Sequence, residues 1–281
     1  MRYDDQGRFD PSPLGGRGVR PSPALALGGG AGAVVVIVIA LLFGVDPGQV
    51  LRGGPGTAGP GGAASCPRGS DAEHDRDCRI LAVTRSLQEY WSGARPDDQD
   101  TAVQTFEGSV RTGCGSANSP VGPFSCPADA TVYVDLGFVD QLGPRGGAAA
   151  EAYVVAHAFG HQVQRRTGAL QRVQDSGPGT GPRSPAVRLE LQADCYAGVW
   201  FAHAAGDPDD AVAGVDADDL DRAVGAATAV GEERLRRRVP GQVTPESWTS
   251  GSAAEQQRWL RRGFETGDPE RCDTFAADAL R

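Results

Sequence analysis

Several residue types and patterns are missing from this sequence. It has no lysine, so all 27 of its basic residues are arginine. Together with 40 glycines and 20 prolines, this composition favours the coding bias of a GC-rich genome, which the base composition of the coding DNA would test. An excess of positive charge is also missing. The net charge of −9 argues against nucleic acid as a partner, because phosphates attract basic surfaces.

Cysteine pairs of the C-x-x-C type are absent as well, and no cysteine stands beside a histidine at zinc-finger spacing. This pattern argues against a cysteine zinc site. The six cysteines that do occur would form disulfides in an oxidising compartment, and six cysteines allow 15 pairings. Two short spacings favour the set Cys66–Cys78, Cys114–Cys126 and Cys195–Cys272. Buried free thiols are the alternative if the domain is cytosolic.

The first 65 residues are predicted to lie outside the folded domain. Residues 1–23 are rich in glycine, proline and arginine without apolar periodicity, which predicts a disordered tail. Residues 24–45 carry no charge and are long enough for a transmembrane helix, which needs about 20 apolar residues. A buried helix and a cleaved signal peptide are the alternatives. Residues 46–65 read as a Gly/Pro-rich flexible linker, so the folded domain is expected over residues 66–281.

Arginines predict the orientation of this span. Only Arg52 closely follows it, whereas four arginines precede it: Arg2, Arg8, Arg17 and Arg20. The positive-inside rule then places the N-terminus in the cytoplasm. We therefore expect a single-pass protein of the cell membrane, attached by one N-terminal helix, with an extracytoplasmic C-terminal domain.

The domain itself is predicted to be α+β and mainly helical. Thr131–Leu136 alternates apolar and polar residues, which indicates a strand. A glycine- and proline-containing stretch over 171–184 is predicted to be a loop. Apolar periodicity predicts helices over residues 77–91, 148–167, 185–205, 216–238 and 252–265. No internal repeat is found.

Two histidines stand at metal-ligand spacing within the most apolar of these helices, in the pentad His157-Ala158-Phe159-Gly160-His161. Side chains at i and i+4 share one helix face, as in the zinc motif H-E-x-x-H. The pair alone could equally be polar members of a partly buried helix. Glycine inside a helix costs about 1 kcal/mol relative to alanine, so Gly160 suggests that another element approaches closely there.

The next predicted helix carries two carboxylates at the same spacing, Glu190 and Asp194. Two histidines and a glutamate are an established set for zinc, so Glu190 fits the third ligand. Asp194, one turn later, fits a carboxylate that hydrogen-bonds a ligand histidine. The alternative is a salt-bridged face, for example with Arg188 or Arg165.

Several sequence blocks follow one another along the chain: Thr112-Gly-Cys-Gly115, Gly122-Pro-Phe-Ser-Cys-Pro-Ala-Asp129, Tyr153-Val-Val-Ala-His157, Arg188-Leu-Glu-Leu-Gln-Ala-Asp-Cys-Tyr-Ala-Gly-Val-Trp200 and Arg261-Arg-Gly-Phe-Glu-Thr-Gly-Asp-Pro269. In these blocks and their order, the chain resembles one known family, the bacterial neutral zinc metallopeptidases that are membrane-anchored and zincin-like. The resemblance covers nearly the whole chain and implies a zincin-like helical core, a zinc cofactor, His157 and His161 as ligands, and Glu190 as the third.

The chain departs from this family at Ala158, where the family pattern has the glutamate that accepts a proton from the attacking water. No substitute is evident. Glu151 lies seven residues earlier, about 10.5 Å along the helix, and is expected to be solvated. Gln162 cannot accept a proton at neutral pH. His203 is a weak candidate for oxyanion stabilisation, although an exposed position at a helix end is expected for it, and His74 is expected at the surface.

Three functions remain open at this point. The first is a membrane-tethered metallopeptidase homologue that binds zinc, hydrolyses peptides weakly or not at all, and could hold a peptide or protein in its cleft. The second is a non-enzymatic extracytoplasmic module that binds a peptide or protein. The third is an active zinc peptidase that uses another base.

Overall fold

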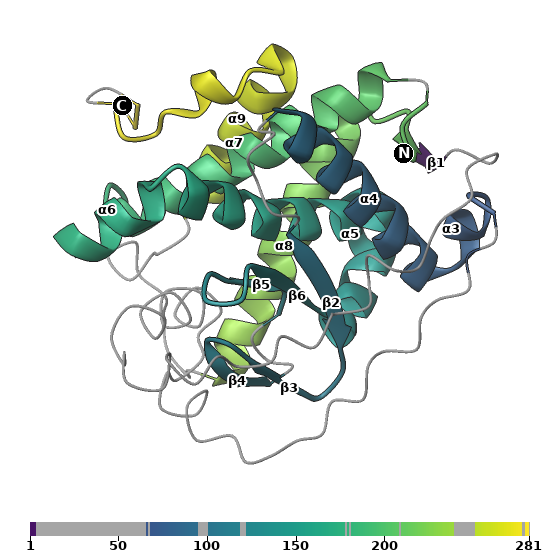
Figure 1. Ribbon diagram of the computed structural model, residues 1–281, viewed down its shortest axis with the longest axis horizontal. Coiled ribbons are helices and arrows are strands. Elements are labelled where there is room, and N and C mark those ends of the chain that lie inside the picture. Colours follow the sequence, from purple (N-terminus) through teal and green to yellow (C-terminus); the bar gives the residue numbers. More distant parts are fainter. Residues whose placement is uncertain are drawn as a thin grey trace.

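Helices make up most of the domain, with a small sheet at one side (Figure 1). The computed structural model describes residues 1–3, 66, 68–94, 101–118, 122–177, 179, 181–207, 209–238, 251–276 and 279–280. Its balance of helix and strand confirms the prediction of a mainly helical α+β domain.

A three-stranded sheet in the order β2-β6-β5 supports the long helix that follows it. Its strands are β2 (Ala102–Phe106), β5 (Phe124–Cys126) and β6 (Thr131–Asp135). Strand β6 runs parallel to β2 and antiparallel to β5. All five residues of β6 are buried, as expected for a central strand covered on both faces. The strand predicted from alternation is thus confirmed, except that its sixth residue already belongs to a helix.

A hairpin of β3 (Ser109–Thr112) and β4 (Gly115–Asn118) forms a separate antiparallel pair. Its Cys114 is bonded to Cys126 of β5, so a covalent bond joins this hairpin to the main sheet.

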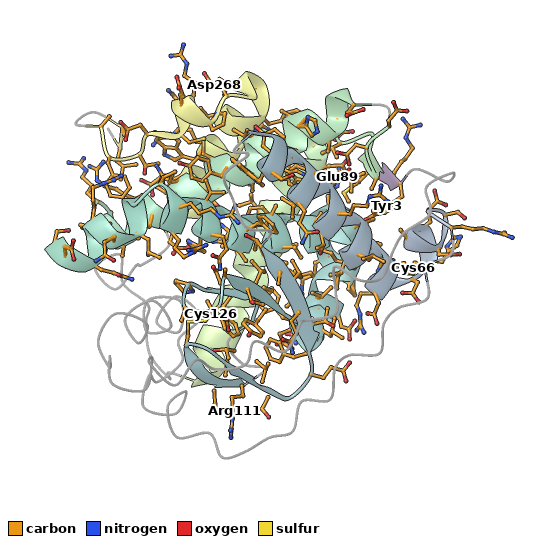
Figure 2. All side chains as sticks on the ribbon, viewed as in Figure 1. Tyr3, Cys66, Glu89, Arg111, Cys126 and Asp268 are labelled. Atoms are coloured by element: carbon orange, nitrogen blue, oxygen red, sulfur yellow. A yellow bond between two sulfur atoms is a disulfide. The ribbon has the colours of Figure 1, made fainter. Side chains whose placement is uncertain are left out.

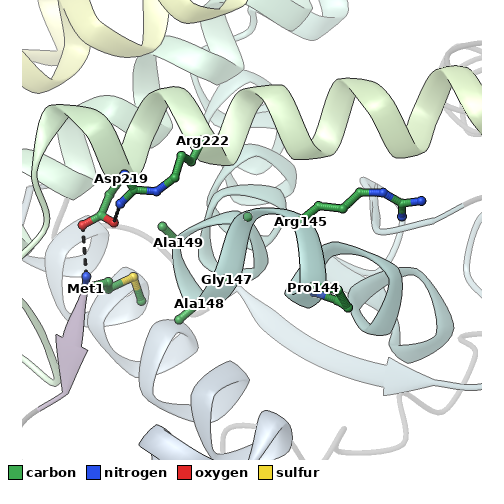
Figure 3. A pocket seen from close by; sticks show the side chains of 9 residues that line it. Met1, Pro144, Arg145, Gly147, Ala148, Ala149, Asp219 and Arg222 are labelled. Carbon is green, nitrogen blue, oxygen red and sulfur yellow. Dashed lines mark hydrogen bonds and ion pairs between the residues drawn. The ribbon is translucent and has the colours of Figure 1, made fainter.

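Helix α5 (Leu136–Arg166) follows β6 directly and carries the histidine pair. The Asp135 side chain caps it by accepting a hydrogen bond from the Gly137 N–H. The helix is interrupted at Gly147, whose φ of 63° is a conformation that favours glycine. The part beyond Gly147 corresponds to the helix predicted over 148–167. Figure 3 shows this interruption at the wall of a pocket, together with Met1 and Asp219, which line the same pocket. The pocket has a volume of about 260 Å³.

Helix α8 (Ala217–Arg238) packs closely against the interrupted part of α5. A Cβ on Gly146 would lie only 2.7 Å from the Cβ of Ala226. Glycine at this position therefore lets the two helix backbones approach.

Helix α7 (Pro185–Gly206) carries the predicted carboxylates and starts where the sequence predicts. The Ser184 hydroxyl caps it by accepting from the Val187 N–H, and proline stands at the first helical position. Helix α9 (Ala253–Thr266) starts with a capping box of Ser252 and Glu255. Both helices agree with their predicted ranges to within one residue.

Helices α7 and α9 cross at two glycines. A Cβ on Gly198 of α7 would overlap the Leu260 carbonyl oxygen of α9, and one on Gly263 of α9 would overlap the Cys195 carbonyl oxygen. The backbones are therefore in direct contact, and glycine is required on both sides.

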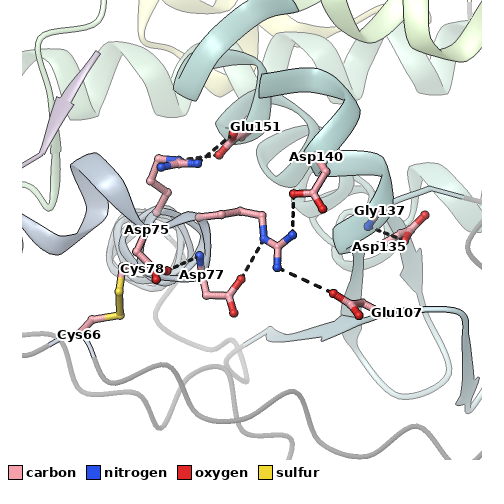
Figure 4. A network of polar contacts seen from close by, with 11 residues as sticks. Cys66, Asp75, Asp77, Cys78, Glu107, Asp135, Gly137, Asp140 and Glu151 are labelled. Atoms are coloured by element: carbon pink, nitrogen blue, oxygen red, sulfur yellow. Dashed lines mark hydrogen bonds and ion pairs between the residues drawn. A yellow bond between two sulfur atoms is a disulfide. The ribbon is translucent and has the colours of Figure 1, made fainter. Parts of the chain in front are cut away.

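Two arginines tie helix α4 (Arg76–Ala94) to α5, as Figure 4 shows. Arg76 donates to Asp140 at 2.6 Å. Arg79 donates to both carboxylate oxygens of Glu151, at 2.6 and 3.1 Å. The short helix α3 (Asp71–His74) precedes α4, and the helix predicted over 77–91 is confirmed within α4.

The loop predicted over 171–184 is wrong in its first part, because α6 (Ala169–Ser176) occupies it. This helix buries a stripe of Ala169, Leu170 and Val173. This apolar stripe is short, and the glycines and prolines that follow it in the sequence favour a loop, so the helix was not predicted. After α9, the 3₁₀ helix η5 (Pro269–Cys272) leads into the C-terminal segment.

Three disulfides staple the domain: Cys66–Cys78, Cys114–Cys126 and Cys195–Cys272. These are the pairs that the sequence favours. Figure 2 labels Cys66 beside α3 and Cys126 on the sheet. The third disulfide joins α7 to η5. Its Cys195 directly follows Asp194 in the sequence.

The expected membrane localisation is contradicted. Among the residues that the structure describes, no helix combines the length and the apolar character needed to cross a bilayer. Moreover, β1 (Arg2–Tyr3) pairs with β7 (Val212–Ala213) of the domain, and the Met1 amino group lies 3.0 Å from Asp219. The expected topology would place these partners on opposite sides of a membrane. The predicted span over 24–45, the linker over 46–65 and most of the tail lie outside the described residues.

Candidate metal centre

Helix α5 presents His157 and His161 on one face, one turn apart. Their ring centroids lie 4.9 Å from each other and the rings are nearly perpendicular. His161 is buried, and the His157 side chain is 18 % exposed. The pair is thus reachable at one edge and otherwise enclosed by the core.

Helix α7 brings Glu190 to this pair. Its Oε2 atom lies 3.1 Å from His157 Nε2 and 3.6 Å from His161 Nε2. The helices can approach because residue 160 is glycine: a Cβ there would lie 3.0 Å from both the Cα and the carbonyl oxygen of Ala193. The close approach expected from Gly160 is confirmed.

The geometry of the three side chains fits zinc. One donor atom each from His157, His161 and Glu190 lies within 4.8 Å of the other two. Bonds of about 2.0–2.1 Å in a tetrahedral arrangement put neighbouring ligand atoms about 3.3 Å apart, close to the two separations from the Glu190 oxygen. Two imidazole nitrogens and one carboxylate oxygen are also a donor set that zinc accepts.

A second carboxylate lies behind the cluster. Asp194 Oδ1 lies 2.8 Å from His157 Nδ1 and accepts a hydrogen bond from the Tyr153 hydroxyl at 2.6 Å. Asp194 is fully buried. The sequence did not single out Tyr153, although it stands four residues before His157 and therefore on the same helix face.

Charge is concentrated in this buried site. Burial lowers the pKa of His157, but Asp194 and Glu190 outweigh it and raise that pKa to about 10. Burial raises the pKa of Glu190, but the two histidines outweigh it and hold that pKa at about 2. Burial raises the pKa of Asp194 above its ordinary value, against the donors around it. The two carboxylates therefore stabilise a positive charge at His157, next to Glu190.

Comparison with known proteins identifies the family of this chain. Residues 4–275 match the model of the family described as Putative neutral zinc metallopeptidase. The chain belongs to this family. It is 42 % identical over 255 residues to Uncharacterized protein Rv2575 of Mycobacterium tuberculosis (strain ATCC 25618 / H37Rv), with 86 % of each chain covered. It is 39 % identical over 204 residues to Uncharacterized protein YpfJ of Escherichia coli (strain K12), with 70 % of this chain and 69 % of that one covered. No solved structure matches.

In this metallopeptidase homologue, Ala158 stands beside the first histidine and is buried. Gln162, one turn further, donates to the Ser125 hydroxyl at 2.7 Å and to the Cys126 carbonyl at 3.0 Å. Its amide links α5 to the sheet. The expectation that Glu151 is solvated is wrong, because it is buried against Arg79. Arg79 donates to both Glu151 oxygens, so the buried carboxylate is paired, without which its burial would be costly.

The structure does not bring His203 to the cluster. Thirteen residues separate it from Glu190 along α7, which is about 19.5 Å of helix. Its side chain packs on the Tyr90 ring, with centroids 4.8 Å apart, and lies 3.8 Å from Asp210. His74 is exposed at the end of α3, as expected.

Proposed function

We propose that this chain binds one zinc ion through His157, His161 and Glu190, and that it hydrolyses peptides weakly or not at all. The observation that carries the proposal is the placement of three donor atoms, from two helices, at separations suited to tetrahedral zinc. Membership of a zinc metallopeptidase family supports the same metal.

The roles of the residues follow from their contacts. Glu190 would supply the anionic ligand, and Asp194 would hold His157 with its Nε2 lone pair toward the metal. When bound, zinc would polarise a carbonyl and lower the pKa of a water molecule at its open position. A peptide or protein segment held at the exposed edge of His157 is the expected ligand.

Proton transfer is the step that this site lacks. The methyl group of Ala158 can neither take a proton from water nor pass one to a leaving amine. Both Glu151 oxygens are engaged by Arg79, and the Gln162 amide is held by Ser125 and Cys126. General acid–base catalysis contributes about 10²–10⁴-fold, so we expect residual activity lower by that factor than in a homologue with the glutamate.

Metal analysis of the purified protein tests the proposal. After dialysis against metal-free buffer we expect one zinc per chain, and none in His157→Ala. His203→Ala is the matched control, because it removes the same side chain at the far end of α7 and should leave the zinc content unchanged.

A peptidase assay on an unfolded substrate, with and without chelator, completes the test. Folded wild-type protein without zinc would overturn the proposal and favour a non-enzymatic binding module. Rapid cleavage that a chelator abolishes would instead favour an active peptidase with another base.

A further inference from the structure

Hydrogen bonds through two buried side-chain amides connect the second histidine to the disulfide-linked 3₁₀ helix η5. His161 Nδ1 lies 2.9 Å from Gln164 Oε1. Gln164 Nε2 lies 3.2 Å from Gln192 Oε1, and Gln192 Nε2 lies 2.9 Å from the Cys272 carbonyl oxygen. Both glutamines are buried, Gln164 completely. This series of hydrogen bonds, called the relay below, connects α5, α7 and η5.

The direction of this relay is fixed by its far end. A backbone carbonyl can only accept, so the Gln192 amide must turn its NH₂ group toward Cys272 and its oxygen toward Gln164. Gln164 must then present its NH₂ group to Gln192. A second acceptor demands the same orientation, because the Leu189 carbonyl oxygen lies 2.6 Å from Gln164 Nε2.

This orientation leaves only the Gln164 oxygen to face His161. An amide oxygen cannot donate, so the hydrogen bond at 2.9 Å requires a proton on His161 Nδ1. The other ring nitrogen, Nε2, is the one that lies 3.6 Å from the Glu190 oxygen. A neutral His161 with its proton on Nδ1 keeps the Nε2 lone pair free for a metal.

We propose that Gln164 and Gln192 are positioning residues that fix His161 as the Nδ1–H tautomer, with the Cys272 carbonyl as the anchor of the relay. The inference rests on the proposed zinc centre, which it deepens. It assigns the two ligand histidines different supports, a carboxylate for His157 and a neutral amide chain for His161.

Charge balance explains why the second support is neutral. Glu190 and Asp194 already provide two buried negative charges, which one Zn²⁺ would match. A third carboxylate in place of Gln164 would bury an unmatched charge, and buried charge is costly unless it is paired.

Substitution of Gln164 tests the positioning role. Gln164→Met removes the acceptor at nearly constant volume, and we expect zinc affinity to fall by about 10–100-fold, the usual effect of losing a hydrogen bond to a ligand histidine. The visible spectrum of the Co²⁺-substituted protein should change as well. Gln192→Met should have a smaller effect, because Leu189 still orients Gln164.

Gln162→Met is the matched control. It removes a buried amide with several hydrogen bonds from the same helix, and none of these involves His161. Its zinc affinity and Co²⁺ spectrum should match the wild type even if its thermal stability falls. Equal zinc affinities in Gln164→Met and Gln162→Met would overturn the positioning role.

Nitrogen-15 NMR of the wild-type protein separates this inference from the zinc proposal. We expect a proton on His161 Nδ1 in both the metal-free and the zinc-loaded protein. An unprotonated Nδ1 refutes the relay even if zinc binds stoichiometrically. A protonated Nδ1 in a protein that never retains zinc supports the relay and refutes the zinc centre.

Discussion

The Nδ1 atom of His157 lies 2.8 Å from the Oδ1 atom of Asp194, across the interface between α5 and α7. The two residues are 37 positions apart in the sequence, and Asp194 is fully buried. Because the aspartate is held inside the core, its contact fixes the orientation of the ring. The Nε2 atom of His157 is thereby directed to Glu190.

Replacing Asp194 by asparagine should therefore weaken metal binding. The Asp194→Asn side chain has nearly the same size, but it loses the negative charge that favours a proton on His157 Nδ1. We expect zinc affinity to fall by about 10–100-fold, as for other partners of ligand histidines. Competition with a chromophoric chelator measures this change.

Tyr153→Phe is the control for this prediction. It removes one hydrogen bond to the same carboxylate oxygen and leaves the contact between Asp194 and His157. The carboxylate keeps its negative charge and its position beside His157 Nδ1, so zinc affinity should fall less in Tyr153→Phe than in Asp194→Asn. If Asp194→Asn shows no larger loss than Tyr153→Phe, the aspartate does not orient the histidine.

Two helix glycines should respond to alanine in opposite directions. A Cβ at Gly198 would overlap the Leu260 carbonyl oxygen, whereas one at Gly225 of α8 meets nothing within 4 Å. Overpacking costs about 1–3 kcal/mol, so Gly198→Ala should lower the free energy of unfolding by about 1–3 kcal/mol or more. Gly225→Ala should raise it by up to about 1 kcal/mol, the helix propensity difference. Urea unfolding of both variants is the measurement, and a stable Gly198→Ala would contradict the close crossing of α7 and α9.

Local signals account for most of what the sequence could predict. The spacing of His157 and His161 depends only on helix periodicity, and the start of α7 depends on the cap at Ser184 and the proline after it. The pairing of Glu190 with the histidines joins the patterns of two helices, and it rests on the known zinc set of two histidines and a glutamate.

Several other contacts between distant segments could not be predicted in this way. The parallel pairing of β2 with β6 joins strands that are separated in the sequence by the β3–β4 hairpin and by β5, and no local pattern encodes it. Glu151 was expected in solvent as a first-turn residue of its helix, whereas its partner Arg79 is 72 residues away in the sequence. Gln164 and Gln192 are polar residues on apolar helices, and their meaning emerges only when Cys272 is placed beside them.

The ion pair between Glu151 and Arg79 should support stability but not metal binding. Both side chains are largely buried, with exposures of 7 % and 17 %. Removal of one partner from a buried pair costs about 3–5 kcal/mol, so Glu151→Gln should lower the free energy of unfolding by an amount of that order. Asp221→Asn, which breaks an exposed pair with Arg261, should cost about 0–1 kcal/mol. Zinc content should stay unchanged in both variants, and loss of zinc in Glu151→Gln would indicate a direct role at the site.

The disulfide between Cys195 and Cys272 should stabilise the domain more than that between Cys66 and Cys78. Their sequence separations are 77 and 12. The chain-entropy model gives about 4.5 kcal/mol for the longer loop and about 3 kcal/mol for the shorter one. The double variants Cys195→Ala/Cys272→Ala and Cys66→Ala/Cys78→Ala should differ accordingly in urea unfolding. An equal loss in both would show that loop length does not determine the effect here.

Restoring a carboxylate beside the first histidine tests why hydrolysis should be weak. If only the base is missing, Ala158→Glu should raise the rate of peptide cleavage by about 10²–10⁴-fold, the usual contribution of general acid–base catalysis. Ala158→Gln is the matched control, because it has the same length but cannot accept a proton at neutral pH. Ala158 is buried, so the melting temperature of each variant must be recorded to separate inactivity from unfolding. A folded, zinc-loaded Ala158→Glu protein that is no faster than Ala158→Gln would mean that the site has lost more than one residue's function.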